Sequence, residues 1–145
     1  MKRHVAIAAL LMAIGLAAPA HAADPSGIWL VQDGDAHVRI AKCGDGFCGT
    51  LVWLEHPNDP TTGRPLTDVR NPDPSKRGKP LLGTMIAINF LPLMDPPNTW
   101  AGKFYNADDG MQYEGSIRPN GADELLVKGC LGTACDTQKW TKVRR

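Results

Sequence analysis

Hydrophobic and polar residues alternate with a repeat of two along much of this 145-residue chain. Residues 111–118 read MQYEGSIR and residues 37–40 read HVRI, so apolar side chains fall on one face and polar ones on the other. This repeat is typical of a β-strand that buries one face and exposes the other. Runs of this kind and the turns between them predict eight strands, at residues 27–33, 36–43, 48–55, 81–90, 99–106, 111–118, 124–129 and 137–143.

The residues between these runs favour tight hairpins. Asp-Gly at 33–34 and Asn-Gly at 120–121 supply the positive φ angles that such turns need. The 12 Pro and 15 Gly of the chain disfavour long helices. Eight consecutive strands can hide their edges by closing into a barrel, whose interior holds side chains or one small ligand. We therefore predict an all-β fold, a small antiparallel up-and-down eight-stranded barrel, with a flattened β-sandwich as the alternative.

Two segments interrupt this pattern. Residues 56–80 contain six Pro and three Asp, and a connection of this length without a strand pattern is often functional. The segment is either a lid over the barrel mouth or a surface loop with one helical turn. Residues 91–98 form the second irregular stretch, and their Leu93 and Met94 either line an entrance or cover one barrel end.

The first 22 residues have the order of a secretory signal peptide. Lys2, Arg3 and His4 precede an apolar run at residues 5–18, and Pro-Ala-His-Ala follows, with small residues before a cut after Ala22. The run is shorter than the roughly 20 residues of a transmembrane helix. We expect a signal peptide at residues 1–22, a single barrel domain at residues 23–145, and a periplasmic or secreted protein. A membrane anchor or a buried first helix is the alternative.

The composition of the expected mature chain excludes some partners. Without Lys2 and Arg3, the 16 Lys and Arg fall to 14 against 15 Asp and Glu, a net charge of about −1. Nucleic-acid-binding proteins usually carry a basic stripe instead. No later apolar stretch reaches the length of a membrane span. We expect no nucleic-acid partner, no membrane span after cleavage, and a monomer or weak dimer.

The four cysteines form two Cys-x4-Cys pairs around glycine-containing turns. An even number of cysteines in an exported chain indicates disulfides, and two strands joined by such a turn bring their Cα atoms within bridging distance. We favour Cys43–Cys48 and Cys130–Cys135 among the three possible connectivities. A zinc site of four thiolates is the rival, but it is disfavoured by the spacing and by the oxidising compartment.

Several polar residues of the long loop are candidates for a ligand site. Asp68, Asn71 and Arg77 would lie near a barrel mouth together with Tyr105, and charge-assisted hydrogen bonds from them would orient a ligand. The alternative is that Asp68 and Asn71 cap the backbone of their own loop, while Arg77 pairs with an acid. Further candidates for lining residues, which are equally candidates for the core, are Val31, Trp53, Ile86, Ile88 and Tyr113.

No sequence motif indicates catalysis or a cofactor. The chain lacks Gly-x-Ser-x-Gly, a nucleotide-binding glycine loop and His-Glu-x-x-His. Asp108-Asp109-Gly110 lacks the ligand series of a calcium loop and is expected to be a hairpin turn. We expect no catalytic residues, no metal and no cofactor, although carboxylates such as Asp68 and Asp109 leave a hydrolase open as an alternative.

The opening Gly27-Ile28-Trp29 resembles the first strand of lipocalins and of the wider calycin group. The resemblance implies that Trp29 closes one barrel end and that a basic side chain of the last strand lies over it. Lys142 or Arg144, close to Trp140 in the sequence, would supply that cation.

Longer blocks carry a second resemblance, to the exported bacterial family known as domain of unknown function 2147. They are residues 43–54 (CGDGFCGTLVWL), 68–74 (DVRNPDP), 80–83 (PLLG), 100–110 (WAGKFYNADDG) and 138–143 (QKWTKV), with Arg77 and Tyr113 between them. This resemblance implies a calycin-like barrel and no established activity. Residues 101–104 (AGKF) depart from the Gly-Gly and the β-branched residue expected there.

Together these observations favour an exported barrel that binds a small apolar or amphipathic ligand in its interior. A structural or interaction protein of the cell envelope with a filled barrel is the main alternative, and a hydrolase acting on an envelope substrate is the other.

Overall fold

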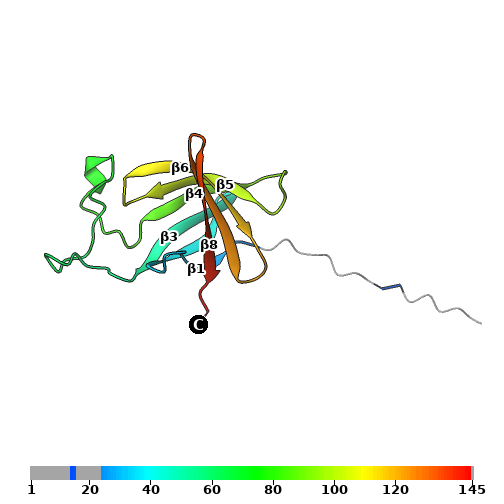
Figure 1. Cartoon of the computed structure of the whole chain (residues 1–145), viewed down its shortest axis with the longest axis horizontal. Coiled ribbons are helices and arrows are strands. Elements are labelled where there is room, and N and C mark those ends of the chain that lie inside the picture. Colours follow the sequence, from blue (N-terminus) through cyan, green and yellow to red (C-terminus); the bar gives the residue numbers. More distant parts are fainter. Residues whose placement is uncertain (1–13, 16–23, 145) are drawn as a thin grey trace, which may run out of the picture.

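The computed structural model describes residues 14–15 and 24–144 and shows eight antiparallel strands closed into one barrel (Figure 1). The expected signal peptide lies almost entirely outside the described residues. Within them, no helix is long and apolar enough to cross a membrane. The strands are β1 (Gly27–Leu30), β2 (Ala36–Cys43), β3 (Gly46–Leu54), β4 (Met85–Pro92), β5 (Trp100–Asn106), β6 (Met111–Pro119), β7 (Glu124–Leu131) and β8 (Ala134–Lys142).

Each strand pairs with the next, and β8 returns to β1. This order confirms the predicted all-β, up-and-down eight-stranded barrel. Seven of the contacts join neighbours in the sequence, whereas the closing contact joins the two ends of the domain. That contact is short, with Trp29 opposite Lys142 and Leu30 opposite Thr141.

The largest differences from the predicted strand bounds lie in β1, at the start of β4 and in the β7–β8 hairpin. β1 ends at Leu30, because Val31 already belongs to the following turn. The Val31 amide donates to the Ala36 carbonyl, and the Val31 carbonyl accepts from the Gly34 amide. β4 begins at Met85 rather than at residue 81, since the amide of Thr84 bonds back to the carbonyl of Leu81 in a turn. The β7–β8 hairpin extends to its disulfide, so both strands are longer than predicted.

The core follows from the alternation along the strands. Val38 and Ile40 of β2 are buried. Ala87 and Phe90 of β4 are buried in the same core cluster. Gly49 lies where a Cβ atom would come within 2.8 Å of the Ala87 Cβ, so the two strands approach closely only because this residue has no side chain. Side chains therefore fill the middle of the barrel.

The barrel end where the chain enters β1 is closed by aromatic and basic side chains. Trp29 is almost fully buried and donates its indole N–H to the Pro25 carbonyl at 2.9 Å. Lys142 Nζ lies 5.2 Å from the centroid of the Trp29 ring, in the range of a cation–π contact. Arg144 instead pairs with Asp123 at 2.5 Å. Trp140 is buried in the same core.

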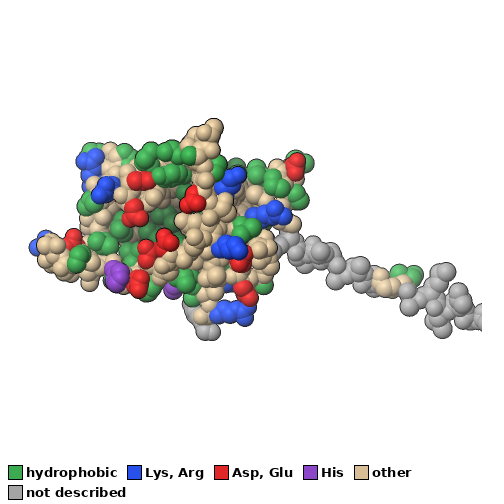
Figure 2. All heavy atoms as spheres, viewed as in Figure 1, with side chains coloured by type: hydrophobic (Ala, Val, Ile, Leu, Met, Phe, Trp, Pro, Cys, Tyr) green, Lys and Arg blue, Asp and Glu red, His purple; other side chains and the backbone are tan. Residues whose placement is uncertain are grey.

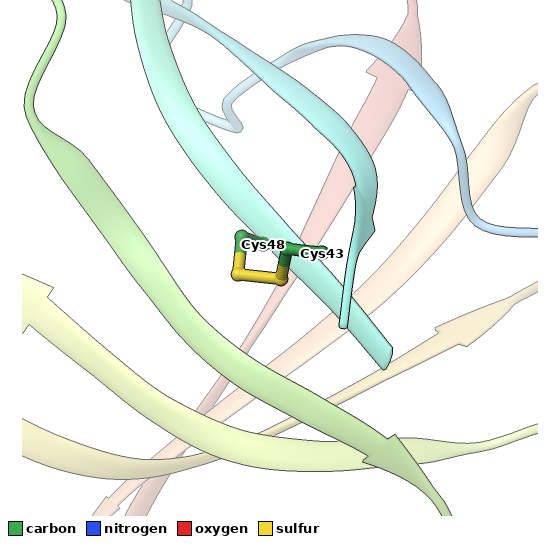
Figure 3. Close-up of a disulfide and its surroundings, with 2 residues drawn as sticks. All are labelled: Cys43 and Cys48. Carbon is green, nitrogen blue, oxygen red and sulfur yellow. A yellow bond between two sulfur atoms is a disulfide. The ribbon is translucent and has the colours of Figure 1, made fainter. Parts of the chain in front are cut away.

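Two disulfides pin the hairpins, with the connectivity that the spacing favours. Cys43–Cys48 joins β2 to β3, with Cα atoms 5.7 Å apart (Figure 3). Cys130–Cys135 joins β7 to β8 at a Cα separation of 4.0 Å. None of the cysteines in the described residues is free.

Residues 55–84 extend from the opposite end of the barrel, beyond the ends of β3 and β6 (Figure 1). The segment contains one 3₁₀ turn, η1 (Pro74–Lys76), and two isolated β-bridges, Asn58 with Pro65 and Thr67 with Pro80. On the face seen in Figure 2 the molecule is hollowed near its centre, with hydrophobic side chains on the floor and acidic side chains around the rim.

Candidate functional site

The long loop is a folded structure that doubles back on itself. The Asp68 amide bonds to the Lys79 carbonyl at 2.9 Å, and the Leu81 amide bonds to the Leu66 carbonyl at 2.9 Å. Within the returning part, the Asp73 carboxylate caps η1 by accepting hydrogen bonds from the amide and hydroxyl of Ser75. Asp73 thus stabilises a local turn, as Asp residues commonly do.

A buried carboxylate links this loop to the barrel. Asp68 is only 3 % exposed, and its Oδ1 accepts a hydrogen bond of 2.6 Å from the Tyr105 hydroxyl of β5. Its Oδ2 accepts a second bond, of 2.8 Å, from the Asn71 side-chain amide. Arg77 braces the arrangement, because its Nε donates to the Asn71 carbonyl at 2.7 Å. The structure therefore brings together the four polar residues proposed from the sequence.

The environment keeps Tyr105 protonated. Burial, followed by the hydrogen bond to Asp68 and the negative charge of that carboxylate, raises the pKa of Tyr105 to about 12. The phenol is consequently a hydrogen-bond donor at every physiological pH. A donor fixed in this way can hold the loop against β5 through its hydrogen bond to Asp68.

This anchored loop borders an open cavity of about 720 Å³. Such a volume lies within the usual range of small-molecule sites, roughly 300–1,000 Å³. The loop contributes most of the wall, and β4, β5 and β6 contribute the rest. The lining residues are Asp68, Asn71, Pro72, Asp73, Lys76, Lys79, Pro80, Leu82, Gly83, Thr84, Met85, Ile88, Tyr105, Gly110 and Gln112.

The strand register shows that this cavity lies outside the barrel. Ala87 and Phe104, which are paired, both pack in the core. Ile88 and Tyr105 are each one residue further along their strands, and successive side chains of a strand point to opposite faces. Gln112 is paired with Tyr105 and shares its face. The cavity thus lies between the outer face of β4–β6 and the loop.

The cavity wall combines charged and apolar groups. Lys76 and Lys79 are exposed at its edge. Leu82 and Met85, which also line the cavity, are 42 % and 47 % exposed, so the wall presents apolar surface to solvent. A molecule that has both a polar and an apolar part matches this lining in chemical character.

The structure places two of the further candidates, Trp53 and Tyr113, away from the cavity. Tyr113 is paired with the core-packed Phe104 and so faces the barrel interior, where its hydroxyl donates to the Asp109 carboxylate. Trp53 is 40 % exposed and lies against His37, with ring centroids 4.3 Å apart. Neither Trp53 nor Tyr113 lines the cavity.

Several lining residues were not singled out from the sequence, among them Leu82, Met85 and Gln112. Leu82 and Met85 fall in the stretch assigned to a strand, so nothing marked them as parts of a loop wall. Gln112 belongs to the polar face of the alternating run at residues 111–118. Polar side chains on the outside of a barrel are ordinarily solvated. Gln112 is part of a site because the long loop folds over this part of the outer face.

The structure bears on metal binding and on the two carboxylates that left a hydrolase open. Over residues 14–15 and 24–144, no three His, Cys, Asp or Glu side chains are grouped to hold a metal ion. Asp68 lines the cavity, whereas Asp109 is engaged with Tyr113 and does not. A second, smaller cavity of about 430 Å³ lies on the other side of the molecule's core, at the β2–β3 turn and Trp100.

The fold and the cavity define a small lipocalin-like β-barrel with a pocket under its longest loop. A family model described as an uncharacterised protein conserved in bacteria, DUF2147, matches residues 27–142, and the chain belongs to that family. The chain is also similar in structure to HP1028 from Helicobacter pylori, described as belonging to the lipocalin family. The TM-score is 0.70, at 18 % identity over 84 % of each chain. No match was found among curated proteins.

Proposed function

We propose that this protein is an exported binding module that holds a small amphipathic molecule in the cavity between the long loop and the outer face of β4–β6. The observation that carries the proposal is the cavity itself, which has a suitable volume and a mixed lining. The sequence favoured a ligand in the barrel interior. The side chains that fill the middle of the barrel and the register of Tyr105 favour the outer cavity instead.

The proposed location outside the cytoplasm rests on two further observations. The first 22 residues have the order of a signal peptide. All four cysteines are paired in disulfides, which persist in oxidising compartments and are rare in the cytosol. A periplasmic or secreted protein that carries a small molecule is consistent with both.

The anchoring of the loop supports a built site. Asp68, Tyr105 and Asn71 are in the wall of the cavity and are hydrogen-bonded to one another, so the loop is held over the strands without a ligand. A site that is largely formed beforehand loses little ordering entropy when it binds.

The test is to fill the cavity with a side chain. Gln112→Trp, on the exposed outer face of β6, would occupy the space. Glu114→Trp is the matched control, because Glu114 lies two residues further on the same face, is exposed and does not line the cavity. Native mass spectrometry of periplasm-purified protein, and titration with the neutral dye Nile red, would measure occupancy.

We expect the wild type and Glu114→Trp to retain a molecule and to bind the dye, and Gln112→Trp to bind at least about tenfold more weakly, because the added indole removes the ligand's volume. Equal binding by all three would place any ligand elsewhere, including the barrel interior. No binding by any of them would favour the structural protein with a filled barrel.

A further inference from the structure

We infer that the cavity selects an anionic amphiphile, a carboxylate or phosphate headgroup on a single apolar chain. The inference rests on the proposed function and adds the chemical class of the ligand. Lys76 and Lys79 would bind the headgroup, and the chain would lie along Leu82, Met85 and Ile88.

Three of the four carboxylate oxygens in the cavity wall are already engaged. Both oxygens of Asp68 accept hydrogen bonds, from Tyr105 and from Asn71. The Asp73 Oδ1 accepts two, from the amide of Ser75 at 3.0 Å and from its hydroxyl at 2.7 Å. At these three oxygens, a cationic ligand would have to displace these donors or share acceptors that hold the loop together.

The donors of the wall, by contrast, are available. Neither Lys76 nor Lys79 has a carboxylate within 4.0 Å in the part of the chain that the structure describes, where the ion pairs involve other residues. The Lys79 amide bonds to the Lys76 carbonyl at 3.0 Å, so one turn carries both side chains. Each ammonium offers three donors and no acceptor, which suits an anionic headgroup.

The apolar part of the wall adjoins this turn in the sequence. The chain passes from Lys79 through Pro80 to Leu82 and Met85, and Ile88 follows on β4. Leu82 and Met85 are more than two-fifths exposed and lie in the wall of the cavity. An alkyl chain that covers them would remove this surface from water, and that gain is proportional to the area buried.

The contribution of the headgroup to the affinity can be measured with four ligands that share a twelve-carbon chain: dodecanoate, dodecyl phosphate, dodecanol and dodecylamine. Calorimetric titration below their micellar concentrations gives each affinity. The double variant Lys76→Gln and Lys79→Gln removes the two ammonium groups. The matched control, Lys128→Gln and Lys139→Gln, removes the same charge from exposed positions of the β7–β8 hairpin that do not line the cavity.

We expect at least one anion to bind about tenfold or more tightly than dodecanol, because charge-assisted hydrogen bonds are stronger than neutral ones. That advantage disappears in the Lys76 and Lys79 double variant, whereas the control retains it. The tighter of the two anions identifies a fatty-acid-like or a phospholipid-like source.

The two proposals fail in different ways. Dodecanol binding as well as the anions, or an anion preference that survives in the Lys76 and Lys79 double variant, would overturn the anion inference and leave the binding function in place. Tighter binding of dodecylamine would also overturn it. Binding of none of the four ligands, together with no molecule retained in native mass spectrometry, would overturn the binding function itself.

Discussion

The hydrogen bond between Tyr105 and Asp68 is the contact on which the cavity depends, and Tyr105→Phe removes it with little other change. The ring remains, and only the hydroxyl that donates to Asp68 at 2.6 Å is lost. Asp68 is 97 % buried and would keep only its bond from Asn71. Hydrogen bonds to charged groups contribute about 1.5–3 kcal/mol, so we expect a loss of that size in the free energy of unfolding.

Tyr113→Phe is the matched control. It removes the same hydroxyl from a tyrosine–aspartate pair, but Asp109 is exposed and water can replace the donor. Urea unfolding followed by tryptophan fluorescence measures both variants. We expect the destabilisation by Tyr105→Phe to exceed that by Tyr113→Phe clearly.

The pH dependence gives a second reading of the same contact. The pKa of Tyr105 is raised from 10.0 to about 12 in the folded protein, so its contribution is fully present below pH 10 and is lost as the pH rises towards 12. The loss between pH 10 and 11 is at most about 1.4 kcal/mol, and solvent at the edge of the site lowers it. Phe cannot titrate, so the advantage of the wild type over Tyr105→Phe should shrink over this interval.

Two results would contradict this reasoning. Equal destabilisation by the two Tyr→Phe variants would show that burial does not strengthen the Asp68 contact. A difference between the wild type and Tyr105→Phe that stays constant from pH 9 to pH 11 would show that the phenol is not held in its protonated form by the fold.

Two other predictions concern the turns. Gly110→Ala should destabilise the protein more than Gly121→Ala in urea unfolding, and it should also weaken Nile red binding. Both glycines have φ above +70°. Only at Gly110, however, would a Cβ collide with the backbone of Arg70 in the loop. Equal effects would argue against that collision. Replacing Cys43 and Cys48 by Ser should lower the free energy of unfolding by about 2 kcal/mol, as expected for a short closed loop. Non-reducing peptide mapping of the wild type tests the pairing, which a peptide linking the two hairpins would contradict.

Most of the barrel could be predicted from the sequence, because its strands are half-buried and their turns contain Gly, Asn and Asp. Such signals are local. The alternation at residues 111–118 specifies a strand, and the glycine at 121 specifies the turn that follows it, each from a few neighbouring residues. The hairpin disulfides are local as well, since each joins residues five apart. Strand ends were less predictable, as at Leu81–Thr84, where a turn overrides an apolar run.

The candidate site could be predicted only in part, because long-range contacts form it. Asp68 and Tyr105 are 37 residues apart, and no local pattern indicates that the loop folds over the outer face of β5. Trp53 shows a similar difficulty. A bulge between His37 and Val38 shifts the register of β2 against β3, and Trp53 then lies beside His37 on the outside. A single inserted residue reverses the face of those that follow, and alternation alone does not reveal it.

The short seam between β1 and β8 also has a consequence for how the molecule is made. Its two residue pairs join the first strand to the last, so β1 has no second neighbour until Thr141 and Lys142 have been synthesised. The ribosome delivers the N-terminal part first, and the barrel cannot close before these two residues have been made. Each disulfide joins the two strands of one hairpin, so its formation does not require the closing contact between β1 and β8. A chain that stops before Thr141 would therefore carry all four cysteines and still lack a closed barrel wall.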